Sequence, residues 1–406
     1  MSIATEFGRL LKIPSRLKEV GIEYVTSLMQ DVGKRSLTAA SRQSGLNVSQ
    51  FSRFLSGHQA LAFENLNRLA RRRLSRLLPA RRSLVKGTPW RIALIIDATL
   101  HERSSRHLDN AQRFNHGQGW VIGHQWTNVI LVINGEVVPL PPIAFLTEEK
   151  CIELGQEYKT ESERILEFLS VCNWKDLLPG VDPSEIVVLS DSGYDNKALQ
   201  RFFLEQGWDF VGSLKKTRSV KTTTQAWQSV SELFRRTRKI GPWQTVRHQA
   251  SSGKKRRELR VRTLLGLLKG VNRQVRLLAT KKPNGENLYL ACSRSSVEAG
   301  AISRTYRLRW TVELFHRDVK NYLGLEDAGL TRFDAIHAHV LWVYCTYLLL
   351  AEIGGKGKTT LDRRRSVERA LQSEEVGRVL QLNSRFDGKA AVQNYYSQVR
   401  ERLKTG

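Results

Sequence analysis

The sequence predicts an α/β protein in which a mixed β-sheet is flanked by helices and followed by a β-rich insertion. Three observations indicate this class. Two β-branched, apolar runs, residues 91–97 and 185–191, are typical of buried central strands, and each run ends in an aspartate. Segments with helical spacing of apolar residues flank them. A basic segment of alternating apolar and polar residues, 215–292, precedes a long helical stretch.

Residues 1–88 are predicted to be a helical DNA-binding domain. Residues 36–56 (SLTAASRQSGLNVSQFSRFLS) have the pattern of a helix-turn-helix with Gly45 in the turn. The second helix would present residue types that contact base edges and phosphates, namely Ser49, Gln50, Ser52 and Arg53. Because the pattern is loose, an ordinary helical hairpin is the alternative.

A run of arginines follows this pattern. It comprises Arg71, Arg72, Arg73, Arg76, Arg81 and Arg82, with a break at Pro79. Next to a DNA-binding element, we expect such a run to contact phosphates, whereas a solvated linker would explain the same composition without DNA.

Residues 89–214 are predicted to form the first part of a catalytic core. The expected elements are strands at 91–97, 127–134, 136–146, 185–191 and 208–214, and helices at 161–174 and 194–206. Residues 215–292 are expected to be a β-rich basic insertion, with a turn at Asn284–Gly285. Core helices follow at 293–355, one from about 296 to 323 and one at 333–353. Residues 356–406 are predicted to be a C-terminal helical region.

Charge indicates the partner of this chain. Of its 406 residues, 65 are Lys or Arg and 39 are Asp or Glu, which gives a net charge of +26. Such an excess favours a polyanion, most simply nucleic acid, although basic proteins of the ribosomal kind share it. The four cysteines are scattered and contain no CxxC pair, which argues against a structural zinc site. Free thiols fit a reducing compartment. No secretory segment is recognised at the N-terminus, and residues 338–353 are shorter than a bilayer span, so we expect a cytoplasmic protein without a membrane partner.

Four polar residues share one face of the predicted helix at 296–323. Tyr306, Arg309, Glu313 and Lys320 fall within about 60° around a helix axis. A solvated face with an Arg–Glu pair four residues apart is the simplest explanation. However, Asp97 and Asp191, at the ends of two strands, together with Glu313 would supply three hard oxygen donors. Such donors suit two Mg²⁺ or Mn²⁺ ions acting on a phosphodiester.

The pattern Tyr-x2-Arg-x3-Glu-x6-Lys resembles the Y-R-E-K signature of bacterial insertion-sequence transposases of the DDE type. Residues 96–99 (IDAT) resemble the first aspartate segment of that family, and residues 190–195 (SDSGYD) resemble its second, a D-x-G-Y motif. The resemblance covers roughly residues 90–350. It implies an RNase H-like core, a β-strand insertion between the second aspartate and the glutamate, and cut-and-paste transposition.

The resemblance also implies roles for single residues. Asp97, Asp191 and Glu313 would bind two Mg²⁺ ions, for which Mn²⁺ can substitute, while Tyr306, Arg309 and Lys320 would contact phosphates near the cleaved end. Trp227 or Trp243 of the insertion would stack on an extruded base, although either could be a core residue. Asp195 is a spare carboxylate that we expect to cap the following helix. Four histidines, His101, His107, His116 and His124, fit no zinc spacing and are expected in a polar loop at the mouth of the site.

The implied partners are double-stranded DNA, both the terminal inverted repeats and the target, with a homodimer on paired ends in the bacterial cytoplasm near the nucleoid. Two other functions share these residues. One is an RNase H-like, metal-dependent nuclease in defence or repair. The other is a domesticated DNA-binding regulator, which has no need of three intact carboxylates.

Overall fold

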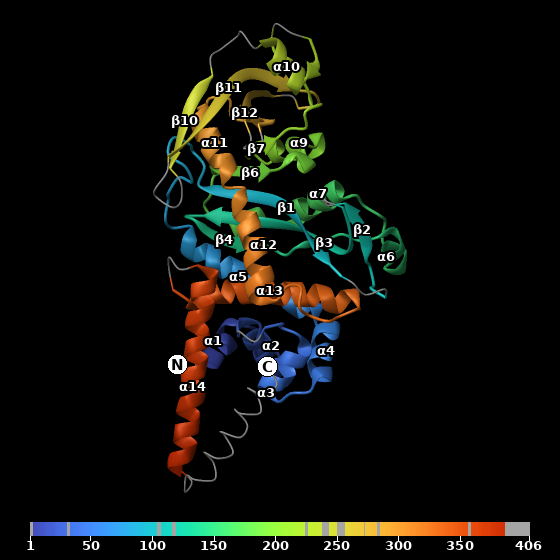
Figure 1. Cartoon of the computed structure of the whole chain (residues 1–406), viewed down its shortest axis with the longest axis vertical. Helices are drawn as coiled ribbons and strands as arrows, with labels where there is room; N and C mark the ends of the chain where they lie inside the picture. The colour runs from blue at the N-terminus through green and yellow to red at the C-terminus, as the bar shows by residue number, and fades with distance from the viewer. Residues whose placement is uncertain are drawn as a thin grey trace.

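We describe a computed structural model of the chain (Figure 1). It describes residues 3–30, 33–103, 107–115, 119–223, 226–237, 243–249, 256–271, 273–281, 285–355 and 359–385. A large mixed sheet occupies the centre of the molecule, helices cover it, and the helices between residues 3 and 57 lie on the other side of the horizontal helix α13 (Phe333–Ile353). This α/β arrangement with flanking helices confirms the predicted fold class and is consistent with an RNase H-like core.

The central strands hold the two predicted aspartates. Strand β1 (Ile92–Glu102) pairs in parallel with β6 (Ile186–Ser190), which pairs in parallel with β7 (Asp209–Ser213). On its other side β1 pairs antiparallel with β3 (Trp120–Ile133), which also carries β2 (Gln112–Asn115), β4 (Glu136–Pro139) and β5 (Ile143–Ala144). The apolar runs that predicted these strands are buried, and β1 and β3 are longer than predicted.

The insertion continues this sheet instead of building a separate one. Strand β13 (Asn287–Cys292) pairs antiparallel with β7, and the sheet runs on through β12 (Gln274–Lys281) and β11 (Arg256–Leu268). β8 (Ser219–Lys221), β9 (Gln228–Ser229), β10 (Gln244–Gln249) and α10 (Val230–Arg236) complete the insertion at one end of the molecule (Figure 1). The predicted β character is confirmed, while Asn284 of the predicted turn lies outside the described residues.

Helices pack on both faces of the central strands. α7 (Glu161–Val171) and α9 (Lys197–Glu205) follow the helices predicted at 161–174 and 194–206 with shorter bounds, and the short helix α8 (Trp174–Leu177) was not predicted. Thr127, which stands opposite Ala98, donates a hydrogen bond to Glu161 of α7 at 2.6 Å. The neighbouring residue Asp97 instead contacts Arg309. Because successive side chains of a strand point to opposite faces, α7 and the helix after Arg309 cover opposite faces.

The single helix predicted from 296 to 323 is two helices. α11 (Ala299–Arg307) and α12 (Trp310–Leu323) are separated by Leu308 and Arg309, whose backbone N–H groups donate to the carbonyls of Thr305 and Tyr306, both at 3.0 Å. Such bonds to the third residue back form a tighter turn than an α-helix. The prediction of one continuous stripe was therefore wrong, because Tyr306 lies on a different helix from Glu313.

Helix α13 (Phe333–Ile353) has the predicted bounds and is a core helix. It is long and apolar enough to cross a membrane by length and composition, but 83% of its most apolar window is buried inside the protein. α14 (Thr360–Arg385) follows it, and the rest of the predicted C-terminal helical region, residues 386–406, lies outside the described residues.

The N-terminal helices are α1 (Ile3–Leu10), α2 (Ser15–Met29), α3 (Leu37–Ser44), α4 (Val48–Gly57) and α5 (Gln59–Leu77). Among them α2, α4 and α5 pack directly on α13. Tyr24 of α2 bonds His339 at 2.6 Å, and the rings of Phe54 and Trp342 stack with centroids 5.4 Å apart. The described part of residues 1–88 therefore shares its core with α13, and no gap in packing separates the predicted DNA-binding domain from this helix.

Candidate active site

Two carboxylates lie at the same level on neighbouring parallel strands, one within β1 and one directly after β6. Asp97 follows Ile96 in β1 and Asp191 follows Ser190 at the end of β6, and Ile96 and Ser190 are register partners. The Asp97 side chain is 16% exposed. Burial raises the pKa of the Asp97 carboxyl to about 7, the charge of Arg309 opposes this shift, and the charges of Asp191 and Glu313 add to it. The three predicted carboxylates are thus close enough to act on one another.

The loop after Asp191 explains the glycine of its motif. The Asp191 carboxylate accepts a hydrogen bond from the backbone N–H of Gly193 at 2.7 Å, which caps a 3₁₀ turn at Ser192–Tyr194. A Cβ atom on residue 193 would lie 2.9 Å from the same carboxylate oxygen, so a side chain there would displace the aspartate. The turn thereby fixes Asp191 at the edge of the sheet.

Arg309 lies among the carboxylates. Its Nη1 atom is 3.3 Å from Asp97 Oδ2, and its Nη2 donates to Oε1 of Glu313 on α12. Beside it, burial raises the pKa of the Tyr306 hydroxyl, while hydrogen bonds to Ser213 and Arg309 lower it. Arg309 therefore supplies the positive charge that this cluster needs in the free protein.

Lys320 occupies the next position along the same edge. Its Nζ donates to the carbonyl of Leu100 at 2.7 Å and lies 2.7 Å from Glu326 Oε1. Thus Arg309, Glu313 and Lys320 all face the C-terminal half of β1. Glu313 remains 32% exposed, so the cluster is accessible from outside.

A buried polar network lies directly beside Asp97 and was missed in the sequence. Asn128 is the register partner of Asp97 on β3; its side chain donates to His316 Nε2 at 2.9 Å and accepts from the Tyr344 hydroxyl. His316 follows Glu313 by three residues on α12, so the network fixes the rotation of that helix against the sheet. The available signal was Asn128 directly before the apolar run at 129–133.

Residues 173–349 match the family model of the transposase DDE domain. This supports a DDE transposase. The matched segment contains Asp191, Arg309 and Glu313. It begins after Asp97. No curated protein matches the chain.

Asp195 has a role different from the predicted one. Asn196, not Asp195, caps α9 by accepting from the N–H groups of Ala198 and Leu199. The Asp195 side chain is 1% exposed and lies 3.4 Å from Arg218 Nε. It also accepts from the backbone of Lys215 and from the Gln200 side chain, both at 3.1 Å. Asp195 therefore anchors the segment that enters the insertion.

His101 and His124 do not lie in a polar loop at the mouth of the site. His101 and His124 are buried register partners on β1 and β3, with 0% and 2% exposure. His124 bonds the carbonyl of Asp109 through Nε2 at 2.8 Å. His107 is exposed, and His116 lies outside the described residues. The sequence prediction was wrong for His101 and His124 because β1 and β3 extend farther than their apolar runs.

The donor chemistry of the three carboxylates fits a hard divalent cation. Oxygen donors are the ligands that Mg²⁺ and Mn²⁺ prefer, and a buried carboxyl with a raised pKa beside two others gains from a bound cation. Among the described residues, no group of three His, Cys, Asp or Glu side chains is already arranged around a common point. Arg309 occupies the space between Asp97 and Glu313, so cation binding requires its guanidinium to withdraw.

The arginines predicted to contact DNA divide into two groups. Arg53 and Arg71 are exposed. Arg73 is 6% exposed and pairs with Glu136 at 3.0 Å and with Glu352 at 3.5 Å, and Arg72 pairs with Glu352 at 3.0 Å. The prediction of phosphate contacts was thus wrong for Arg73, because the periodicity of α5 turns it towards α13.

The two candidate tryptophans of the insertion lie in different surroundings. Trp227 is 42% exposed, with Lys221 Nζ 4.9 Å from its ring centroid. Trp243 is half-buried and lines a cavity of about 380 Å³, with the guanidinium groups of Arg260 and Arg262 at 6.0 and 5.8 Å from its ring. Phe234, Tyr289 and Lys281 also line this cavity. Its mixture of flat rings and cations suits a nucleotide better than the surroundings of Trp227 do.

Proposed function

We propose that this protein is a transposase that binds the terminal inverted repeats of its insertion sequence, cleaves the DNA at those ends and transfers the 3′-hydroxyl ends to target DNA by a cut-and-paste route. The observation that carries this proposal is the convergence of Asp97, Asp191 and Glu313 around Arg309. The matched transposase DDE domain supports an enzyme that acts on DNA.

Asp97, Asp191 and Glu313 would hold two Mg²⁺ ions, or Mn²⁺ in their place. When bound, such ions activate a water or a 3′-hydroxyl and stabilise the oxygen that leaves the phosphorus. The chain's own contribution is to hold the carboxylates on rigid elements and to keep Asp97 largely out of water. The Asn128–His316–Tyr344 network keeps α12, and hence Glu313, in register with β1.

Arg309 is proposed to exchange partners when DNA binds. In the free protein its two N–H groups satisfy Asp97 and Glu313. The same planar fork can chelate a phosphate beside the cleaved bond, once bound cations neutralise the carboxylates. Tyr306 stands beside Arg309, and Lys320 adds a point charge farther along β1, so all three would follow the backbone of the transposon end.

DNA recognition is proposed to involve the exposed face of α4, through Arg53, and the exposed Arg71 of α5. Trp243, with its cavity of aromatic and basic side chains, is the better candidate for an extruded base, and Trp227 is the second. A homodimer on paired ends, working near the nucleoid in a bacterial cytoplasm, completes the proposal. The net charge of +26 supports an association dominated by phosphates.

The test uses DNA that flanks the gene. If terminal inverted repeats bracket it, a labelled repeat is incubated with purified protein and Mg²⁺, and a plasmid target is added. We expect cleavage at the repeat terminus followed by joining to the plasmid. Cleavage without joining, on any duplex, would favour a nuclease of the same fold, and selective binding without cleavage would favour a domesticated regulator.

A further inference from the structure

An exposed two-stranded ribbon extends from the sheet at β2 and β3. In its register Arg113 stands opposite Ile122 and Asn115 opposite Trp120. All four side chains of this outer face are exposed, with Trp120 at 58% and Ile122 at 53%. The other face is packed, since the ring centroids of Phe114 and Phe145 lie 5.5 Å apart. The ribbon thus presents a defined face to solvent, with the Arg113 guanidinium 5.1 Å from the Trp120 ring.

This outer face lies on the same side of the sheet as the Asp97 carboxylate. Asn128 is the register partner of Asp97, and alternate residues of β3 share its face down to Ile122 and Trp120. Between them, Trp126 and His124 pack against Phe333 of α13 on that face. Eight residues of antiparallel strand separate Asn128 from Trp120, which corresponds to about 27 Å.

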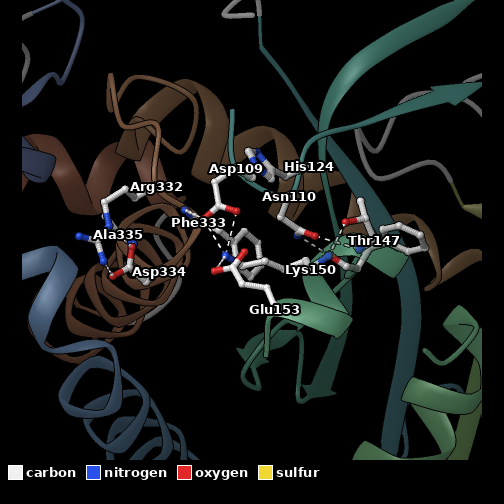
Figure 2. A network of polar contacts seen from close by, with 11 residues as sticks. Asp109, Asn110, His124, Thr147, Lys150, Glu153, Arg332, Phe333, Asp334 and Ala335 are labelled. Carbon is white, nitrogen blue, oxygen red and sulfur yellow. Dashed lines mark hydrogen bonds and ion pairs between the residues drawn. The ribbon is translucent and has the colours of Figure 1, made fainter. Parts of the chain in front are cut away.

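The base of the ribbon is anchored by a network of polar contacts (Figure 2). The Asp109 carboxylate pairs with Lys150 of α6 (Glu148–Glu153) at 2.9 Å and accepts from the backbone N–H of Phe333 at 3.0 Å. Asn110 accepts from the N–H of Thr147 at 2.9 Å and donates to the carbonyl of Phe145 at 2.8 Å. These contacts hold the chain that leads into β2 against both α6 and α13, so the ribbon is positioned before any partner binds.

We propose that the outer face of the β2–β3 ribbon is a contact for duplex DNA that flanks the cleaved phosphate, centred about eight base pairs from it at 3.4 Å per base pair. The inference rests on the proposed function, which places the phosphate at Asp97. A two-stranded ribbon fits the major groove, where arginine and asparagine contact base edges and apolar groups meet thymine methyls. The net charge of +26 favours DNA over a protein partner that has few acidic residues.

A second copy of this chain is the other candidate occupant of this face. Four side chains of a short ribbon cover far less than the ~800 Å² per partner that a stable interface buries. The ribbon face alone therefore does not account for a dimer, whereas a single groove contact of DNA needs no larger area.

The experiment measures the affinity of the full-length protein for labelled duplexes by fluorescence anisotropy, with Ca²⁺ present instead of Mg²⁺. The duplexes carry an inverted-repeat end with arms of about 5 or about 15 base pairs on each side of the terminus, so that only the long arms reach the ribbon at 3.4 Å per base pair. The variants are Trp120→Ala and Arg113→Ala, with Trp120→Phe and Arg113→Lys as milder forms. Val171→Ala, on a residue 75% exposed, and Lys175→Ala, on an exposed residue of α8, are the matched controls.

We expect Trp120→Ala and Arg113→Ala to weaken binding of the long duplex about tenfold while leaving the short duplex at the wild-type affinity. Arg113→Ala should also reduce the salt slope by about one unit, and Arg113→Lys should restore it. The controls should bind both duplexes as the wild type does. Wild-type affinity of both alanine variants for the long duplex overturns the proposal. Loss of dimerisation in sedimentation, with unchanged DNA affinity, also overturns it and assigns the face to a second copy.

Failure of the proposed function gives a different result. In that case the wild-type protein does not cleave or join the end in Mg²⁺, yet arm-dependent weakening by the ribbon variants still reports a DNA contact at this face. Equal weakening of short and long duplexes contradicts the placement of the ribbon relative to Asp97.

Discussion

The Arg309 guanidinium lies 3.3 Å from the Asp97 carboxylate, across the boundary between α12 and β1. The same group pairs with Glu313, so a single side chain joins the strand and the helix that carry two of the three clustered carboxylates. Because the negative charges of Asp97 and Glu313 repel each other, Arg309 keeps the two carboxylates together in the free protein.

Replacing Arg309 separates its pairing with the carboxylates in the free protein from its proposed contact with a DNA phosphate. Arg309→Ala should lower the free energy of unfolding of the metal-free protein by about 1–2 kcal/mol, a value reduced from that of a buried pair because all three side chains are partly exposed. Divalent cations should restore stability, since they replace the lost charge. Cleavage with Mn²⁺ should persist at a reduced level, while the complex with the transposon end weakens. Chemical denaturation with and without Mn²⁺ measures the effect, and Arg309→Lys, which keeps the charge but not the fork, should lie between. No change in stability would show that the pairing contributes nothing.

Asp195 should be sensitive to substitution for a structural reason. Asp195→Asn leaves the charge of Arg218, whose side chain is 9% exposed, without its buried counter-ion, and should cost about 3 kcal/mol. Asn196→Ala is the comparison, because it removes only the α9 cap and should cost about 1 kcal/mol. Denaturant unfolding of both variants tests the difference, and equal costs would mean that Asp195 acts only locally.

Two arginines two residues apart on α5 should behave in opposite ways. Arg71→Ala should leave stability unchanged and weaken binding to all DNA sequences alike, because exposed arginines contact phosphates without regard to sequence. Arg73→Ala leaves Glu352, whose side chain is 1% exposed, short of one partner and should cost about 2–3 kcal/mol of stability. Thermal melts and salt-dependent binding of both variants distinguish the effects. A stable Arg73→Ala protein with weakened DNA binding would contradict the assignment.

The buried histidines should make the protein labile to acid. Burial lowers the pKa of both His337 and His339 to about 4, and His339 is held neutral, with Nδ1 accepting from Tyr24 and Nε2 donating to the carbonyls of Gly324 and Leu325. The unfolded chain therefore binds more protons below pH 6.5, and stability falls as the pH drops from about 6.5 towards 4. Each histidine contributes about 3 kcal/mol to this loss. Unfolding curves at pH 7.5, 6 and 5 test it, since His339→Gln should have a flatter pH profile. An unchanged profile would rule out His339 as a source of the effect.

The sequence predicted the strands well because their apolar runs are buried on both faces of the sheet. It also predicted α13 to the residue, since a long apolar segment of that length fits only a core helix here. The three carboxylates were found because Asp97 and Asp191 follow apolar runs and Glu313 shares a helix register with Arg309. The prediction that Asp97 ends its strand was wrong, because β1 continues to Glu102. These signals are local, and local periodicity determines them.

Other features depend on contacts between distant segments. The break at Leu308–Arg309 has no Pro or Gly to mark it, so it follows from how α11 and α12 pack. The burial of Arg73 depends on Glu136 and Glu352, which are far away in the chain. Deletion of residues 1–88, the predicted DNA-binding domain, would expose Trp342 and His339 of α13.

The central claim is that Asp97, Asp191 and Glu313 hold the cations that cleave the transposon end. The most direct measurement is cleavage of one labelled end duplex in Mg²⁺ by Asp97→Asn, Asp191→Asn and Glu313→Gln, with binding followed in parallel by gel shift. Each variant keeps the shape of the side chain but removes a negative ligand. We predict that all three bind the duplex at least as tightly as the wild type and that none cuts it. Cleavage by Glu313→Gln at the wild-type rate would contradict the account.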